Sequence, residues 1–107
     1  WLKLPYCEGF ERVAQATTMP IILLGGPSNE DPRSTYREFA AGMGARANVR
    51  GAMVGRNVTF PGLDDPAAVA QAVDDIVRKG IGAEQAADVT AASRDMQLDF
   101  LTRYITK

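Results

Sequence analysis

The chain has 107 residues, and its 12 Lys and Arg against 13 Asp and Glu leave a formal net charge of −1. An apolar content of 46% with 23% charged residues is ordinary for a globular domain and argues against intrinsic disorder. The balanced charge and a pI of about 5.3 argue against binding to nucleic acid or to an anionic membrane. The single cysteine, Cys7, excludes an internal disulfide, and the lack of histidine leaves no usual zinc ligand set, so we expect no metal and no cofactor.

The hydropathy of the chain and its first residues indicate its cellular compartment and whether more sequence precedes it. The longest apolar run, Met19–Leu24, is far too short to cross a bilayer, and no signal-peptide pattern opens the chain, so we expect a cytoplasmic protein with no membrane partner. Trp1 is not an initiator methionine and lies in a segment that resembles a strand already begun. We therefore expect the chain to be part of a longer polypeptide.

Short apolar segments alternate with amphipathic ones along the chain. Strands are predicted at 1–4, 20–24 and 52–54, and residues 48–51 are predicted to be a connector. Helices are predicted at about 8–16, from 31 beyond Met43, at 65–79 and at 83–107, the last with a break near Thr90. The run Ile21–Leu24 is apolar without alternation, which is typical of a strand covered on both faces.

Two predicted helices carry the same signal at their start. Asp31-Pro32 and Asp65-Pro66 each place an N-capping residue before a proline at the first helical position. Gly80 predicts the end of the second of these helices. Accordingly, Glu30-Asp31 and Asp64-Asp65 are better explained as helix N-terminal residues than as paired catalytic carboxylates.

The alternation of strands and helices predicts a parallel sheet built from strand–helix–strand units. This pattern is typical of two architectures, namely part of a (β/α)8 barrel and half of an open doubly wound sheet. In both, ligands bind at the carboxyl ends of the strands. No linker divides the chain.

One lysine and two glycine-containing loops are the candidates for chemistry. Lys3 lies within an apolar strand, where burial would lower its pKa and a neutral amine could form a Schiff base; it could equally be an edge lysine that favours solubility. Gly25-Gly26 directly follows a strand and could present backbone N–H groups to an anion, or simply form a tight turn. Gly55-Arg56 follows the next strand, and Arg56 could hold a phosphate or pair with Asp64 or Asp65.

Together, these candidates favour the barrel. Phosphate sites of (β/α)8 barrels are frequently built from the loops after strands seven and eight. On that template residues 1–80 supply strands 6–8 with their helices, and residues 81–107 form a helical extension. The apolar stripe of that extension, which includes Met96 and Phe100, either covers the barrel or meets another subunit, and we expect a homo-oligomer.

Four segments resemble a known family in order and spacing. They are Leu2-Lys3-Leu4-Pro5-Tyr6, Gly9-Phe10-Glu11-Arg12-Val13, Leu24-Gly25-Gly26-Pro27 and Val54-Gly55-Arg56-Asn57-Val58. From Trp1 to about Lys79 the chain is similar to the last three strand–helix units of DhnA-type class I aldolases of the DeoC/LacD superfamily, which includes the archaeal-type fructose-bisphosphate aldolases.

The resemblance implies a role for each candidate. Lys3 would form the Schiff base with a ketose, while Gly25, Gly26, Gly55 and Arg56 would bind the phosphate of a sugar substrate. The acid/base Asp and Tyr of that family come from earlier strands that lie outside this sequence. Because Asn48-Val49-Arg50 and the loop 56–65 depart from the archaeal pattern, the resemblance does not identify the sugar.

The sequence thus predicts a lyase of carbohydrate metabolism that is incomplete as it stands. The alternatives are a phosphate-binding enzyme of another class, such as an isomerase or decarboxylase in which Lys3 forms no imine, and an inactive fragment.

Overall fold

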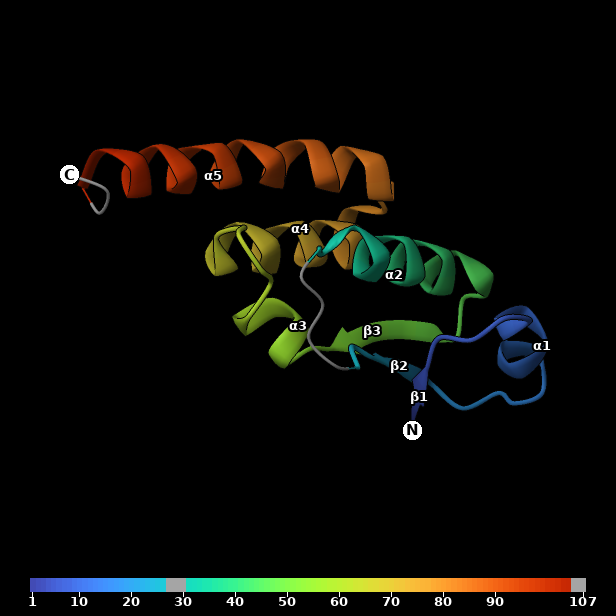
Figure 1. Ribbon diagram of the computed structural model, residues 1–107. Coiled ribbons are helices and arrows are strands. Elements are labelled where there is room, and N and C mark those ends of the chain that lie inside the picture. The colour runs from blue at the N-terminus through green and yellow to red at the C-terminus, as the bar shows by residue number, and fades with distance from the viewer. Residues whose placement is uncertain (27–30, 105–107) are drawn as a thin grey trace.

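Three parallel strands form one sheet on which the helices are stacked (Figure 1). The structure is a computed structural model that describes residues 1–26 and 31–104, with 97–104 described by their backbone alone. Within these residues the strands are β1 (Leu2–Pro5), β2 (Ile21–Leu24) and β3 (Val49–Met53). The helices are α1 (Phe10–Gln15), α2 (Arg33–Ala45), α3 (Arg56–Thr59), α4 (Pro66–Lys79) and α5 (Ala83–Tyr104).

The sheet has the order β1-β2-β3, so β2 is the central strand. Lys3 of β1 is level with Ile22 of β2, and Ile22 is level with Gly51 of β3. The pairing between β2 and β3 is irregular between Ile21 and Ile22. Because the strands are parallel, the loops that follow β2 and β3 leave from the same end of the sheet.

The helices cover one face of the sheet in two layers. Figure 1 shows α2 and α4 lying along the sheet and α5 stacked over them on the side away from the sheet. Ile21 and Leu23 point into this packing and are fully buried, whereas Ile22 and Leu24 on the other face are only partly buried. Met53, on that same face, is 46% exposed. The expectation that Ile21–Leu24 is covered on both faces is therefore wrong, because no described helix lies on the second face.

The predicted (β/α)8 barrel, with residues 1–80 as its strands 6–8, is also wrong. The chain forms a small α/β domain with a three-stranded sheet that does not close. Each strand–helix–strand unit is specified by local periodicity, whereas closure of a barrel requires eight tilted strands with a fixed stagger between them. The outer edges of β1 and β3 have no partner strand among the described residues.

The element boundaries follow the sequence signals where those signals are local. Helix α4 begins after Asp65, whose side chain accepts a hydrogen bond from Ala68 N–H at 3.3 Å, and it ends at Gly80 in the left-handed conformation. Both features confirm the prediction. Helix α5, in contrast, is continuous through Thr90, and the predicted break is absent. Of its predicted apolar stripe, Met96 is 74% exposed, and Phe100 lies beyond the described side chains.

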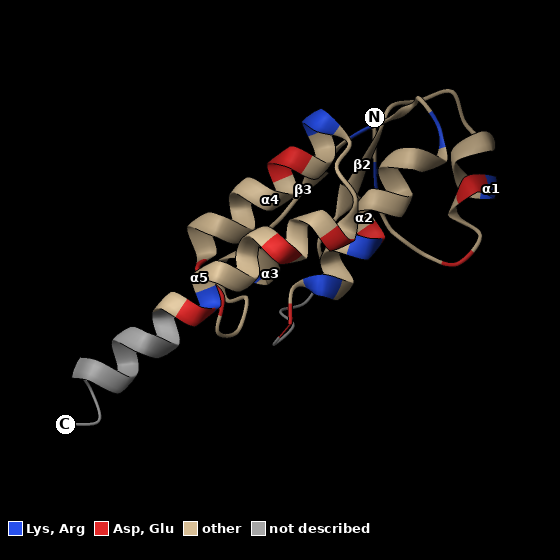
Figure 2. Cartoon of the chain, turned by 90° about the horizontal axis from the view of Figure 1, so that it is seen from above, with Lys and Arg blue, Asp and Glu red and all other residues tan. Residues whose placement is uncertain are grey.

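Charged residues of both signs are scattered over the helices seen from above (Figure 2). On α4, Arg78 pairs with Asp74 at 2.7 Å and Lys79 with Asp75 at 3.4 Å, each pair one helical turn apart. Within the described part of the chain, no helix is long and apolar enough to span a membrane.

Candidate anion-binding site

Lys3 lies on the uncovered face of the sheet. Its neighbours in β1, Leu2 and Leu4, are half-buried on the helix side, while Lys3 itself is exposed. This alternation follows from the two-residue period of a strand. A neutral amine at Lys3 was expected to result from burial, but the described residues leave this side chain exposed. The catalytic role of Lys3 stays a prediction.

The glycine pair follows β2 directly, and its two members have different surroundings. Gly25 is held by its backbone, because its N–H donates to Met53 O of β3 at 3.0 Å. Gly26 has a φ of 75°, in the left-handed region that favours glycine. No described residue accepts a hydrogen bond from the Gly26 N–H. Of the two amides, that of Gly25 is therefore bonded within the sheet.

Arg56 begins the short helix α3, one residue after Gly55. The side chain of Arg56 is exposed, and it forms no ion pair within the described residues. The alternative pairing with Asp64 or Asp65 does not occur: Asp64 binds Arg94 at 2.5 Å, and Asp65 caps α4.

Asn57 joins the two glycine loops, a role that the sequence alone did not reveal. Its side chain is buried, with 1% exposure. Asn57 Nδ2 donates to Gly25 O at 2.8 Å, and Asn57 Oδ1 accepts from Gly55 N–H at 3.3 Å. The amide thereby connects segments 32 residues apart in sequence. A polar residue after a strand is a common loop residue, so only the tertiary contact marks it out.

The structure thus brings four of the five predicted site residues together and leaves Lys3 apart from them. Gly25, Gly55 and Arg56 gather at the carboxyl end of the sheet through Asn57, with Gly26 next in the chain. Lys3 is level with Ile22, three residues before Gly25 along the strand direction. At about 3.3 Å per residue, this places Lys3 roughly 10 Å from that end.

Two ion pairs lie near the N-terminal ends of α2 and α4, and one of them reaches α5. Arg33 forms an ion pair with Asp31, which lowers the pKa of the Asp31 carboxyl and raises that of Arg33. The ion pair of Asp64 with Arg94 lies on the same side of the helices and raises the pKa of Arg94. Both carboxylates form ion pairs, but the predicted cap at Asp31 is wrong, because α2 begins at Arg33 with Pro32 as its N-cap residue and no side-chain cap. Glu30 lies outside the described residues.

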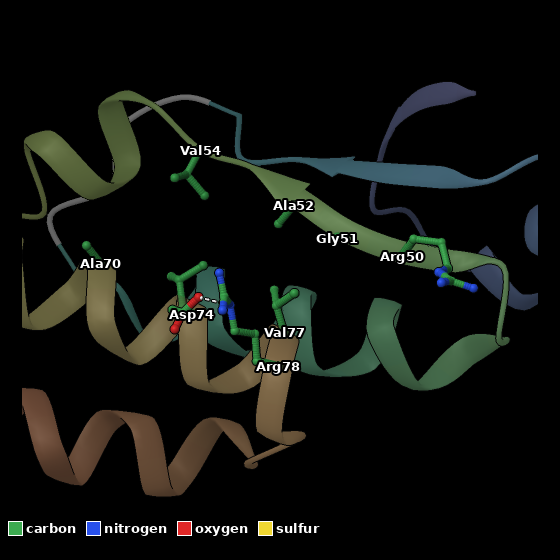
Figure 3. Close-up of a pocket in the computed structure, with 9 residues that line it drawn as sticks. Arg50, Gly51, Ala52, Val54, Ala70, Asp74, Val77 and Arg78 are labelled. Carbon is green, nitrogen blue, oxygen red and sulfur yellow. Dashed lines mark ion pairs between the residues drawn. The ribbon is translucent and has the colours of Figure 1, made fainter.

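A hollow of about 480 Å³ lies elsewhere, between the free edge of β3 and α4 (Figure 3). Val54 of the loop after β3 and Val77 of α4 contribute apolar walls, and Figure 3 shows the Asp74–Arg78 ion pair beside them. None of the predicted site residues lines it. The described residues also contain no group of three or more acidic or cysteine side chains that could hold a metal ion.

The fold and the site define an α/β protein with an open parallel sheet and a candidate anion site at its carboxyl end. Residues 1–77 match the model of the family described as Cgl0159-like, and because this covers most of the chain, the protein belongs to that family. None of the curated proteins compared with the chain matches it. The family match does not test the resemblance to DhnA-type aldolases, which stays a prediction.

Proposed function

We propose that this protein binds a phosphorylated sugar at the carboxyl end of its sheet and acts on it as a class I aldolase. The observation that carries the proposal is the junction of the loops after β2 and β3. The Asn57 side chain donates a hydrogen bond to the Gly25 carbonyl and accepts one from the Gly55 N–H, and so links the two loops. The exposed Arg56 is next to Asn57 in the chain. An arginine guanidinium can bind two phosphate oxygens in parallel, and the left-handed Gly26 allows close approach of backbone to ligand.

Lys3 would supply the reacting amine. In its neutral form the amine adds to the ketone carbon of the substrate, and the carbonyl oxygen leaves as water once the new carbon–nitrogen bond has formed. The protonated imine then accepts the electron pair of the adjacent carbon–carbon bond as that bond breaks, while a base takes the hydroxyl proton of the departing aldehyde. Protonation of the resulting enamine and hydrolysis of the imine return the amine and release the ketone.

The proposal requires one substrate to reach from Arg56 to Lys3 across the width of the sheet, because β1 and β3 are on opposite sides of β2. Lys3 lies roughly 10 Å before the end of the strands, and its flexible side chain covers part of that distance. A phosphate held at Arg56 would fix the sugar so that its carbonyl approaches the amine repeatedly in the same geometry. Self-association and residence in the cytoplasm accompany this proposal as predictions.

Trapping of the imine tests the proposal. The protein is incubated with dihydroxyacetone phosphate and sodium borohydride, and the modified peptide is located by mass spectrometry. We expect one adduct, on Lys3, that inorganic phosphate suppresses by competition. Lys3→Arg should abolish it, whereas Lys79→Arg, which removes a more remote exposed lysine of α4, should leave it unchanged.

Two results would contradict the aldolase. One is an unmodified protein, and the other is an adduct spread equally over Lys3 and Lys79. Because Lys3 is exposed rather than buried, the second candidate is a phosphate-binding enzyme that forms no imine, such as an isomerase or decarboxylase. Phosphate binding without a trapped adduct would favour that candidate.

A further inference from the structure

We infer that Asn57 is the positioning residue of the anion site, and that Gly25 is a glycine because of Asn57 rather than because of the ligand. Since this rests on the proposed function of the two loops, it concerns how that site is assembled. Asn57 would not touch the phosphate; it would hold Gly26 and Arg56 at the separation that a single phosphate requires.

The hydrogen bonds of Asn57 support this role. A primary amide can donate and accept at the same time, and Asn57 does so between two backbones, from Nδ2 to Gly25 O at 2.8 Å and from Gly55 N–H to Oδ1 at 3.3 Å. The side chain is 1% exposed, so water cannot readily replace either bond. Loss of the amide would leave a carbonyl and an N–H unsatisfied, and the two loops would be free to move apart.

The space at Gly25 gives a second, independent observation. A Cβ atom built on Gly25 would lie 2.5 Å from Asn57 Nδ2 and 2.9 Å from Asn57 Cγ, distances that real Cβ contacts essentially never show. The Asn57 amide therefore occupies the space that a side chain at Gly25 would need. The Gly25 N–H is also committed, to Met53 O at 3.0 Å. Gly25 thus acts on the site through Asn57.

These contacts allow a test that separates positioning from folding. Asn57→Ala removes the connection, Asn57→Asp keeps the shape but replaces the donor to Gly25 O with an oxygen, and Gly25→Ala forces a clash. In the double variant Gly25→Ala/Asn57→Ala, the new Cβ enters the space that the amide has left, so the fold should be recovered while the connection remains absent.

Asn48→Ala is a matched control. Asn48 Nδ2 donates to Ala14 O at 3.0 Å and to Thr17 O at 3.2 Å, so this residue also joins backbone segments by an amide. It precedes β3 and therefore lies at the opposite end of the sheet from Asn57. Its loss should lower stability without changing anion binding.

Each variant is measured for its affinity for inorganic phosphate by calorimetry and for its stability by urea unfolding. We expect Asn57→Ala and Asn57→Asp to weaken phosphate binding about tenfold or more, because the loops after β2 and β3 are no longer held together. We expect Asn48→Ala to bind like the wild type. The double variant should regain the stability lost by Gly25→Ala, but not the affinity.

The outcomes distinguish a failure of the positioning role of Asn57 from a failure of the proposed function. Wild-type affinity in Asn57→Asp or in the folded double variant would overturn the positioning role and leave the anion site intact. A wild-type protein that binds no phosphate would overturn the proposed function, and the positioning role with it.

Discussion

Arg94 of α5 donates its Nε–H to the carboxylate of Asp64 at 2.5 Å, across 30 residues of sequence. Asp64 is 2% exposed, so its charge would be costly without this partner. The same ion pair raises the pKa of the Arg94 guanidinium. It fixes α5 to the loop that precedes α4, beside the hydrogen bond between Tyr36 and Thr90.

Removal of Arg94 should therefore destabilise the fold. Arg94→Met leaves a buried carboxylate unpaired, and we expect a loss of about 3 kcal/mol in the free energy of unfolding, measured in urea. Asp64→Asn/Arg94→Met removes both charges and should recover most of it. Arg78→Met, which breaks the exposed pair with Asp74, should change stability by less than about 0.5 kcal/mol. Similar losses for Arg94→Met and Arg78→Met would show that burial of Asp64 has little effect.

Tyr36 should make the fold sensitive to alkaline pH. Burial raises the pKa of Tyr36 to about 12, from an ordinary value of 10.0. Because the pKa is higher in the folded state, the stability due to neutral Tyr36 is fully present below about pH 10 and is lost as the pH rises toward 12. The loss is on the order of 2 kcal/mol.

Tyr36→Phe isolates this effect. At pH 7 the variant should be less stable by about 1 kcal/mol, since it lacks the hydrogen bond to Thr90 Oγ1. Its disadvantage should shrink above pH 10 and reverse before pH 12, because the wild type loses about 2 kcal/mol of stability that the variant cannot lose. A difference that stays constant with pH would contradict the raised pKa.

Substitution by alanine should lower the stability of the fold at one glycine of α2 and raise it at another. A Cβ on Gly42 would lie 2.7 Å from Leu23 Cδ1, in the buried layer between helix and sheet, so Gly42→Ala should cost about 1–3 kcal/mol. A Cβ on Gly44 meets no described atom within 4 Å, so Gly44→Ala should stabilise the helix by about 0.5–1 kcal/mol. Urea unfolding of the two variants measures both, and the same sign of change in both would contradict the packing of α2 on β2.

The sequence predicted those elements whose signals are local. The cap at Asp65 and the helix end at Gly80 both lie within one segment, and both are confirmed. Strand β3 was predicted from Ala52 but begins at Val49, because Arg50-Gly51 has the composition of a connector and only pairing with β2 makes it extended.

Features that depend on distant contacts could not be predicted in this way. The barrel was inferred from local alternation, which does not determine whether a sheet closes. Thr90 was expected to break the last helix; instead its hydroxyl binds Ala86 O of the preceding turn at 3.2 Å and Tyr36 OH at 3.2 Å. Asn57 and Arg94 each act through a partner about 30 residues away, and nothing in their immediate sequence identifies it.

The affinity of Arg56→Ala for inorganic phosphate is the sharpest test of the anion site. A lost charge-assisted pair of hydrogen bonds should weaken binding by about one to two orders of magnitude. Arg56→Lys should recover only part, because lysine keeps the charge but not the two parallel donors. Arg50→Ala, which removes an exposed arginine from β3, should bind phosphate like the wild type. Equal affinity of Arg56→Ala and the wild type would contradict the anion site at the carboxyl end of the sheet.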